Sequence, residues 1–72
     1  MAPHQQRVVE EKAELDSKIE KLSEFIKTGG LTKVSDLEMP LLLEQLRLMQ
    51  KYSIILSRRI ASWDLLAPLV IV

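Results

Sequence analysis

The chain has 72 residues, no cysteine and equal numbers of acidic and basic residues, so its formal net charge is zero. The missing cysteines exclude disulfides, and one histidine does not supply a structural zinc site. A balanced charge argues against generic nucleic-acid coating, which requires a basic excess. With 47% hydrophobic residues, the chain is too apolar to be disordered but too short to bury a large core alone. Oligomerisation is the remaining route to a stable fold.

The first predicted element is a helix over residues 3–27. Pro3 suits the first turn of a helix, and Gly29-Gly30 permits the left-handed cap that ends one. The apolar residues of this segment follow a narrow coiled-coil-like seam made of Val8, Leu15, Ile19, Leu22 and Ile26. Lys12 interrupts the seam. Either its stem packs while its ammonium reaches solvent, or it pairs with a carboxylate of a partner chain.

Residues 28–36 form the predicted connection to a second helix over residues 37–63. Ser35 and Glu38 fit the S-x-x-E capping box, and Asp36 is an alternative N-cap. Two helices of similar length joined by a short turn make an antiparallel hairpin. The predicted fold is therefore all-α, a two-helix hairpin that assembles into a homo-oligomeric helical bundle.

The second helix has more apolar surface than one neighbouring helix can cover. One stripe, interrupted only by Ser53, consists of Leu42, Leu46, Met49, Leu56, Ile60 and Trp63. A second stripe, about 100° around the helix, consists of Leu41, Leu48 and Ile55. A basic strip consists of Arg47, Lys51 and Arg58. This helix thus offers two surfaces to bury and one that suits an anion.

The last segment, residues 64–72, is an apolar tail that carries no charge after Asp64. Exposed, such a tail would promote aggregation, so we expect it to pack on a neighbouring subunit. The chain shows no secretory signal and no run of the ~18 apolar residues that spanning a bilayer needs. These features predict a cytosolic protein without a membrane partner.

The sequence shows no catalytic motif, so we do not expect an enzyme. Phosphate recognition is more plausible, because arginine forks and lysine ammonium groups match phosphate oxygens. Tyr52 and Arg59 share one helix face, which combines a stackable ring with a guanidinium, and His4 offers a second ring. Each also has an ordinary structural explanation: Tyr52 as a boundary core residue, Arg59 as a partner of the helix dipole, and His4 as a frayed end.

Two stretches, HQQRVVEEKAELDSKIEKLSEFI over residues 4–26 and EQLRLMQKYSIILSRRI over residues 44–60, carry a family resemblance. The sequence resembles a widespread family of small phage-encoded helical-hairpin proteins, which includes the crAss-phage-related small proteins. It is also similar to the type 2 anti-CBASS sponge over roughly residues 4–63. Two features depart from the sponge pattern: the turn lacks an aromatic residue, and the chain ends in an apolar tail.

The resemblance implies a homo-oligomer, commonly a hexamer, that sequesters cyclic di- and trinucleotides from bacterial immune synthases. Such sponges bind the signal at subunit interfaces in the cytoplasm of the infected host and do not cleave it. The resemblance implies these binding residues: His4 and Tyr52 for stacking, and Arg7, Lys18, Lys27, Thr28 and Arg59 for phosphates. We expect no cofactor, no metal site and no DNA partner, the last two because of the single histidine and the zero net charge. The alternative hypothesis is a helical module that binds a host protein through its apolar surface.

Overall fold

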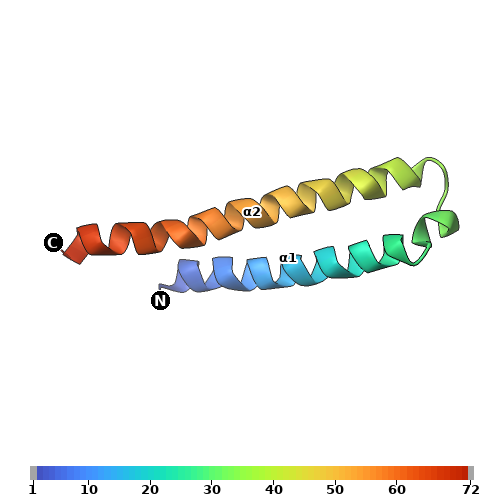
Figure 1. The fold of residues 1–72 in the computed structure, drawn as a ribbon. Coiled ribbons are helices and arrows are strands. Elements are labelled where there is room, and N and C mark those ends of the chain that lie inside the picture. Colours follow the sequence, from blue (N-terminus) through green and yellow to red (C-terminus); the bar gives the residue numbers. More distant parts are fainter. Residues whose placement is uncertain (1, 72) are drawn as a thin grey trace.

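The computed structural model describes the backbone of residues 2–71 and the side chains of residues 2–63. Two antiparallel helices lie side by side (Figure 1): α1 spans Pro3–Lys27 and α2 spans Glu38–Ile71. A short 3-10 helix, η1, spans Gly30–Lys33 in the connection. No strand occurs within this part of the chain. The molecule is a rod of 57 × 17 × 15 Å, and the prediction of an all-helical hairpin is confirmed.

Local capping explains where α1 begins and ends. Pro3 occupies the first turn, and the Gln5 side chain accepts a hydrogen bond of 3.0 Å from the Ala2 N–H. At the other end the Thr28 hydroxyl donates to the Glu24 carbonyl at 2.8 Å. Gly29 follows with φ of 88°, a left-handed conformation that favours glycine. The helix therefore covers the span that the sequence indicated.

Ser35 is the N-cap of α2, because its hydroxyl accepts a hydrogen bond of 3.1 Å from the Glu38 N–H. The predicted end of α2 at residue 63 is wrong, since the helix continues to Ile71. No glycine follows Trp63, and leucine and alanine favour a helix there, so α2 passes residue 63 and continues through Pro68, a residue that disfavours a helix interior. The predicted packing of the tail on a neighbour concerns side chains outside the described residues.

The seam between the helices uses the faces that the periodicity predicted, but it buries little. Among the described apolar side chains, only Val8 and Leu56 are buried, with exposed fractions of 6% and 0%. The other seam residues are half-buried: Leu15, Ile19, Leu22, Ile26, Leu42, Leu46, Met49, Ile60 and Trp63. One pair of helices leaves such a seam open at both sides, so the hairpin has almost no closed core.

A polar group closes the middle of this seam. Lys12 Nζ lies 3.3 Å from Ser53 Oγ and 2.5 Å from an Asp16 carboxylate oxygen, and the Ser53 hydroxyl donates to the other Asp16 oxygen at 2.5 Å. Lys12 thus pairs with a carboxylate of its own chain, which the sequence did not indicate, while 26% of its side chain stays exposed; pairing with a partner chain's carboxylate stays a prediction. Its ammonium is satisfied within the hairpin, where it fixes the register between α1 and α2.

The outer surface of α2 remains strongly apolar. The second stripe is solvent-exposed, at 67% for Leu41, 52% for Leu48 and 52% for Ile55. A further pair, Leu43 and Ile54, lies on the other side of α2 at 46% and 56%, and the sequence analysis did not single it out. Apolar surface of this extent is more than a folded chain usually exposes at one place. Within the described stretch, neither long helix has an apolar run that would cross a bilayer.

Candidate functional site

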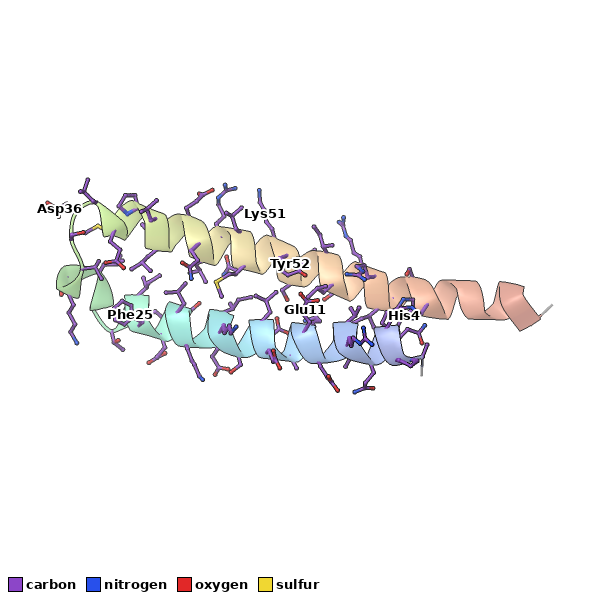
Figure 2. The ribbon with its side chains drawn as sticks, turned by 180° about the vertical axis from the view of Figure 1, so that it is seen from behind. His4, Glu11, Phe25, Asp36, Lys51 and Tyr52 are labelled. Atoms are coloured by element: carbon purple, nitrogen blue, oxygen red, sulfur yellow. The ribbon has the colours of Figure 1, made fainter. Side chains whose placement is uncertain are left out.

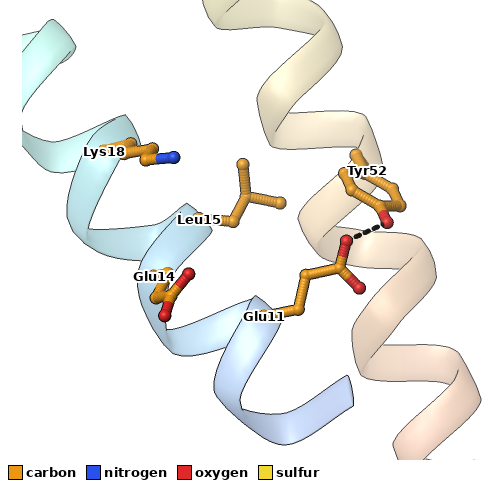
Figure 3. Close-up of a pocket in the computed structure, with 5 residues that line it drawn as sticks. All are labelled: Glu11, Glu14, Leu15, Lys18 and Tyr52. Atoms are coloured by element: carbon orange, nitrogen blue, oxygen red, sulfur yellow. Dashed lines mark hydrogen bonds between the residues drawn. The ribbon is translucent and has the colours of Figure 1, made fainter. Parts of the chain in front are cut away.

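One side of the hairpin collects most of the predicted binding residues, and we call it the tyrosine flank. From α1 it comprises Arg7, Glu11, Glu14, Lys18, Lys21 and Phe25, and from α2 it comprises Leu41, Gln45, Leu48, Tyr52, Ile55 and Arg59. Each set repeats at alternating spacings of four and three, which keeps it on one face of its helix. The Tyr52 hydroxyl donates to the Glu11 carboxylate at 2.5 Å, and this contact places both faces on the same side (Figure 3).

A hollow of about 270 Å³ lies on this flank between the two helices. Figure 3 shows its lining residues, which are Glu11, Glu14, Leu15, Lys18 and Tyr52. Two carboxylates stand here around one ammonium group, so the hollow of a single hairpin repels phosphate. A larger hollow of about 400 Å³ on the outer side of α1 has the same composition of charge, with Ser17, Glu20, Lys21 and Glu24 around it.

Tyr52 is the aromatic residue of the hollow, and 40% of it is exposed. The hydrogen bond to the Glu11 carboxylate raises the pKa of the Tyr52 phenol above 10.0, with desolvation as a second cause. The charge of Arg59 acts in the opposite direction. The phenol is therefore neutral and anchored by its hydroxyl, and it does not act as a base near neutral pH.

Arg7 and Arg59 come together at one end of the tyrosine flank. Two cross-helix contacts bracket them: Glu11 with Tyr52 on one side, and His4 with Trp63 on the other. Arg7 lies between His4 and Glu11, and Arg59 lies between Tyr52 and Trp63, so the two arginines stand level. Both side chains are exposed, and neither makes an ion pair with another described side chain. This is the part of the flank best suited to an anion.

His4 lies just beyond this arginine pair. Its ring meets the Trp63 indole edge-to-face, with the ring centroids 6.4 Å apart and an interplanar angle of 81°. Figure 2 shows His4 at the N-terminal end of α1, against the C-terminal half of α2 and some distance from Tyr52. The interpretation of His4 as a merely frayed residue is therefore wrong, since its ring is packed on α2.

The structure does not bring Lys27 and Thr28 to the other candidates. By helical periodicity Lys27 points to the opposite side of α1 from Arg7 and Lys18. The Thr28 hydroxyl donates to the carbonyls of Glu24 and Phe25, which makes it a cap of α1. Five of the seven predicted site residues thus share the tyrosine flank or its end, and two lie at the turn.

The basic strip of α2 is weaker than its sequence indicates. Arg47 makes a bidentate ion pair with Glu44, at 2.5 and 3.0 Å, and this pair lowers the pKa of the Glu44 carboxyl. Figure 2 shows Lys51 pointing away from α1. Within the described residues, no group of three or more metal-binding side chains lies close together.

Sequence reasoning missed the acidic residues of the site. Glu11 and Glu14 looked like ordinary members of a solvated helix face, yet both line the hollow beside Tyr52. Their spacing contained a usable signal, because they share the α1 face of Arg7 and Lys18. Which residue of α2 this face meets depends on how α1 is aligned along α2. The apolar repeat of either helix does not reveal that alignment.

Comparison with known proteins places the chain by its sequence. The Sequestin family model matches residues 2–62, which includes all of α1 and most of α2. No curated protein and no solved structure matches the chain. The family name is consistent with a protein that sequesters a ligand, as the sequence analysis expected. The matched span covers most of the 72 residues, and the chain belongs to the Sequestin family.

Proposed function

We propose that this protein is a phage anti-defence sponge, which binds cyclic di- or trinucleotide immune signals and holds them without cleavage. The sites lie at interfaces between identical protomers, in a homo-oligomer such as a hexamer, in the cytoplasm of the infected bacterium. Membership of the Sequestin family supports sequestration. The resemblance to the crAss-phage-related small proteins and to the type 2 anti-CBASS sponge supports the nature of the ligand.

The observation that carries the proposal is the composition of the tyrosine flank. Arg7 and Arg59 present two exposed guanidinium groups at one level of the hairpin, and the exposed apolar residue Ile55 lies one turn from Arg59 on the same face of α2. Guanidinium groups bind phosphate in bidentate fashion, and aromatic rings stack on bases whatever their sequence. A second protomer that covers the apolar residues would enclose this ligand between subunits, as binding sites usually require.

Binding without chemistry agrees with the side chains on the flank. The sequence contains no cysteine, and the ring of its one histidine packs against Trp63. The Tyr52 phenol has a raised pKa and is held by Glu11, so it is not an activated nucleophile. A captured nucleotide would therefore be released intact.

Calorimetric titration with a panel of cyclic di- and trinucleotides tests this function. We expect tight binding of at least one member, with the ligand recovered unchanged by mass spectrometry after the protein is denatured. Arg59→Ala should weaken that binding by about tenfold or more, whereas Arg58→Ala, which removes the neighbouring arginine on another face, should not. No binding across the panel, or a cleaved ligand, would refute the sponge.

Exposed leucines near the turn favour a second function, a module that binds a host protein. Leu37 and Leu41 are 84% and 67% exposed, and they lie close together at the start of α2. Sedimentation analysis separates the two functions. A stable monomer with these side chains exposed would favour a protein partner, and a concentration-dependent oligomer would favour the sponge.

A further inference from the structure

The tyrosine flank has the spacing of two coiled-coil seams that lie side by side. The α2 seam runs through Leu41, Gln45, Leu48, Tyr52, Ile55 and Arg59, and the α1 seam through Arg7, Glu11, Glu14, Lys18, Lys21 and Phe25. All of these side chains are exposed. A seam with alternating spacings of four and three is the pattern by which one helix packs along another, yet no described element covers either seam.

The α1 seam is complementary to a reversed copy of itself. If a second α1 runs antiparallel to the first about the level of Asp16, Glu14 meets the partner's Lys18, and Glu11 meets the partner's Lys21. The two-fold axis generates each pair twice, and each pair brings opposite charges together. At the ends of the seam Arg7 meets the partner's Phe25, a guanidinium against an aromatic ring. No like charges are opposed.

The α2 seam is complementary in the same way about the level of Gln50. Leu48 meets the partner's Tyr52, and Gln45 meets the partner's Ile55. Leu41 then meets the stem of the partner's Arg59. Every layer pairs an aliphatic residue with a larger or polar one, as the alternating layers of antiparallel coiled coils allow. The exposed apolar residues of the second stripe are all covered by this arrangement.

The two centres of symmetry coincide in the folded hairpin. Asp16 contacts Ser53 directly, and Ser53 lies within one turn of Gln50. The Glu11–Tyr52 contact instead places Asp16 nearer the level of Arg47, so the two contacts bracket Gln50 from either side. One two-fold axis, perpendicular to the helices at this level, therefore satisfies both seams at once. The sequence of one seam does not require its centre of symmetry to lie level with the centre of the other seam.

A two-fold axis parallel to the helices does not give complementary pairs of residues across the interface. It would lay α1 of one copy on α2 of the other, with level residues opposed. Arg7 would then face the partner's Arg59, and Glu11 would face the partner's Ile55. Like charges would meet, and carboxylates would be buried against aliphatic groups, both of which cost free energy. Charge complementarity selects the perpendicular axis.

We propose that two copies of this chain pack tyrosine flank to tyrosine flank about the perpendicular axis. Each end of the interface then holds Arg7 and Arg59 of one copy beside the partner's Phe25 and the partner's Leu41. Given the proposed function, this cluster is the nucleotide site: two guanidinium groups hold a phosphate and the partner's ring stacks on a base. The dimer carries two such sites, and neither is complete in one chain.

Mixing two charge-reversal variants tests the interface. Glu14→Lys places lysines opposite lysines in its homodimer, and Lys18→Glu places glutamates opposite glutamates. We expect each variant alone to raise the dimer dissociation constant by about tenfold or more, and the equimolar mixture to return it to near the wild-type value. Mixing leaves the charges within each chain unchanged, so a recovery reports only on contacts between chains.

Sedimentation equilibrium, with helicity checked by circular dichroism, measures this effect. Glu20→Lys and Lys27→Glu are the matched controls, because they change the same charges on the opposite side of α1. They should leave association unchanged, alone or mixed. Association of the single tyrosine-flank variants at wild-type strength, or no recovery on mixing, would overturn the interface.

A complementation experiment tests the composite site with cyclic di-GMP and cyclic di-AMP as probes. The double variant Arg7→Ala, Arg59→Ala lacks the guanidinium groups, and Phe25→Ala lacks the ring, so each homodimer should lose binding. In a mixture, each heterodimer regains one complete site of its two. We expect binding to return with reduced stoichiometry, and a mixture that stays silent while the wild type binds would overturn the composite site.

The two experiments separate the two claims. If the wild-type protein ignores both probes, its role as a sponge for these nucleotides and the composite site fail together. The charge-reversal mixture still decides whether the tyrosine flank joins two copies. If the mixture fails while the wild type binds a probe, sequestration stands and the interface lies elsewhere.

Discussion

Lys12 and Ser53, the polar interruptions in the apolar seams of α1 and α2, meet each other across the hairpin, with Nζ and Oγ 3.3 Å apart. Asp16 joins them, so the group satisfies its own hydrogen bonds between the helices. A slip of α1 along α2 by one turn would bury the ammonium against aliphatic groups, at a large cost in free energy. The group therefore specifies register more than it adds stability.

Ser53→Ala should lower the free energy of unfolding by about 1 kcal/mol, because Lys12 loses an acceptor and Asp16 loses a donor in a half-buried position. Urea unfolding followed by circular dichroism measures the change at fixed protein concentration. Ser57→Ala, on the exposed surface of the same helix, is the control and should lie within about 0.5 kcal/mol of the wild type. Equal effects for the two serines would contradict the role of the polar group.

Acid should weaken the hairpin through Asp16. Hydrogen bonds from Lys12 and then Ser53 lower the pKa of the Asp16 carboxyl below its ordinary value of 3.8. A carboxyl whose pKa is lowered by folding stabilises the fold above its unfolded pKa, and this contribution is lost as pH falls through the folded pKa. Stability from this residue should thus be complete at neutral pH and fall below about pH 4.

Thermal unfolding of the wild type and of Asp16→Asn across this range isolates the effect. The melting temperatures of the two proteins should converge as the pH falls, because protonated aspartate resembles asparagine. Glu44→Gln removes a carboxyl with a similarly lowered pKa, but in an exposed ion pair with Arg47, so its effect should be small. A constant difference between wild type and Asp16→Asn at all pH values would count against this account.

Tyr52, the only tyrosine of the chain, should titrate above its ordinary value of 10.0. Its pKa is raised by the hydrogen bond to Glu11 and by desolvation, so the contact stabilises the fold below the unfolded pKa and is lost as pH rises through the folded one. Absorbance of the tyrosinate measures the midpoint directly. Glu11→Gln should move it down, and an unchanged midpoint would show that the contact is absent in solution.

The two turn glycines should differ in what they tolerate. Gly29 has φ of 88° and open space around its α-carbon, so Gly29→Ala should cost about 1 kcal/mol of backbone strain. At Gly30 an added Cβ would collide with the carbonyl oxygen and the ring of Phe25, so the backbone must move, and Gly30→Ala should cost more. Melting temperatures rank the two, and Gly29→Asn, which suits this conformation, should be the mildest of the three.

Capping residues, proline and glycine predicted the helix boundaries wherever one of these residues determines the boundary. Pro3 and Gly29 define α1, and the Ser35 cap defines the start of α2. The end of α2 was wrong, because the change from charged to apolar residues after Trp63 is not a stop signal for a helix. The first helix-breaking residue after Trp63 is Pro68, five positions further on, and α2 runs through it.

The candidate site was only partly predictable, because it depends on which residues of α1 lie level with which residues of α2. Periodicity placed Tyr52 and Arg59 on one face, but it did not reveal that Glu11 bonds Tyr52. The two polar interruptions, Lys12 and Ser53, would have given the register if they had been paired in advance. Thr28 was predicted as a phosphate ligand, and in the hairpin its hydroxyl caps α1; capping and phosphate binding use the same hydroxyl, so the sequence alone does not separate the two roles.

Only Val8 and Leu56 are buried among the described apolar side chains, so the proposed assembly would couple folding to association. If the proposed dimer forms, the chain gains much of its stability by mass action, and its melting temperature should rise with its own concentration. Early in synthesis, dilute chains would be short-lived and exposed to proteolysis. The capacity to bind a ligand would then rise steeply with protein concentration, because each site is completed only when two chains associate.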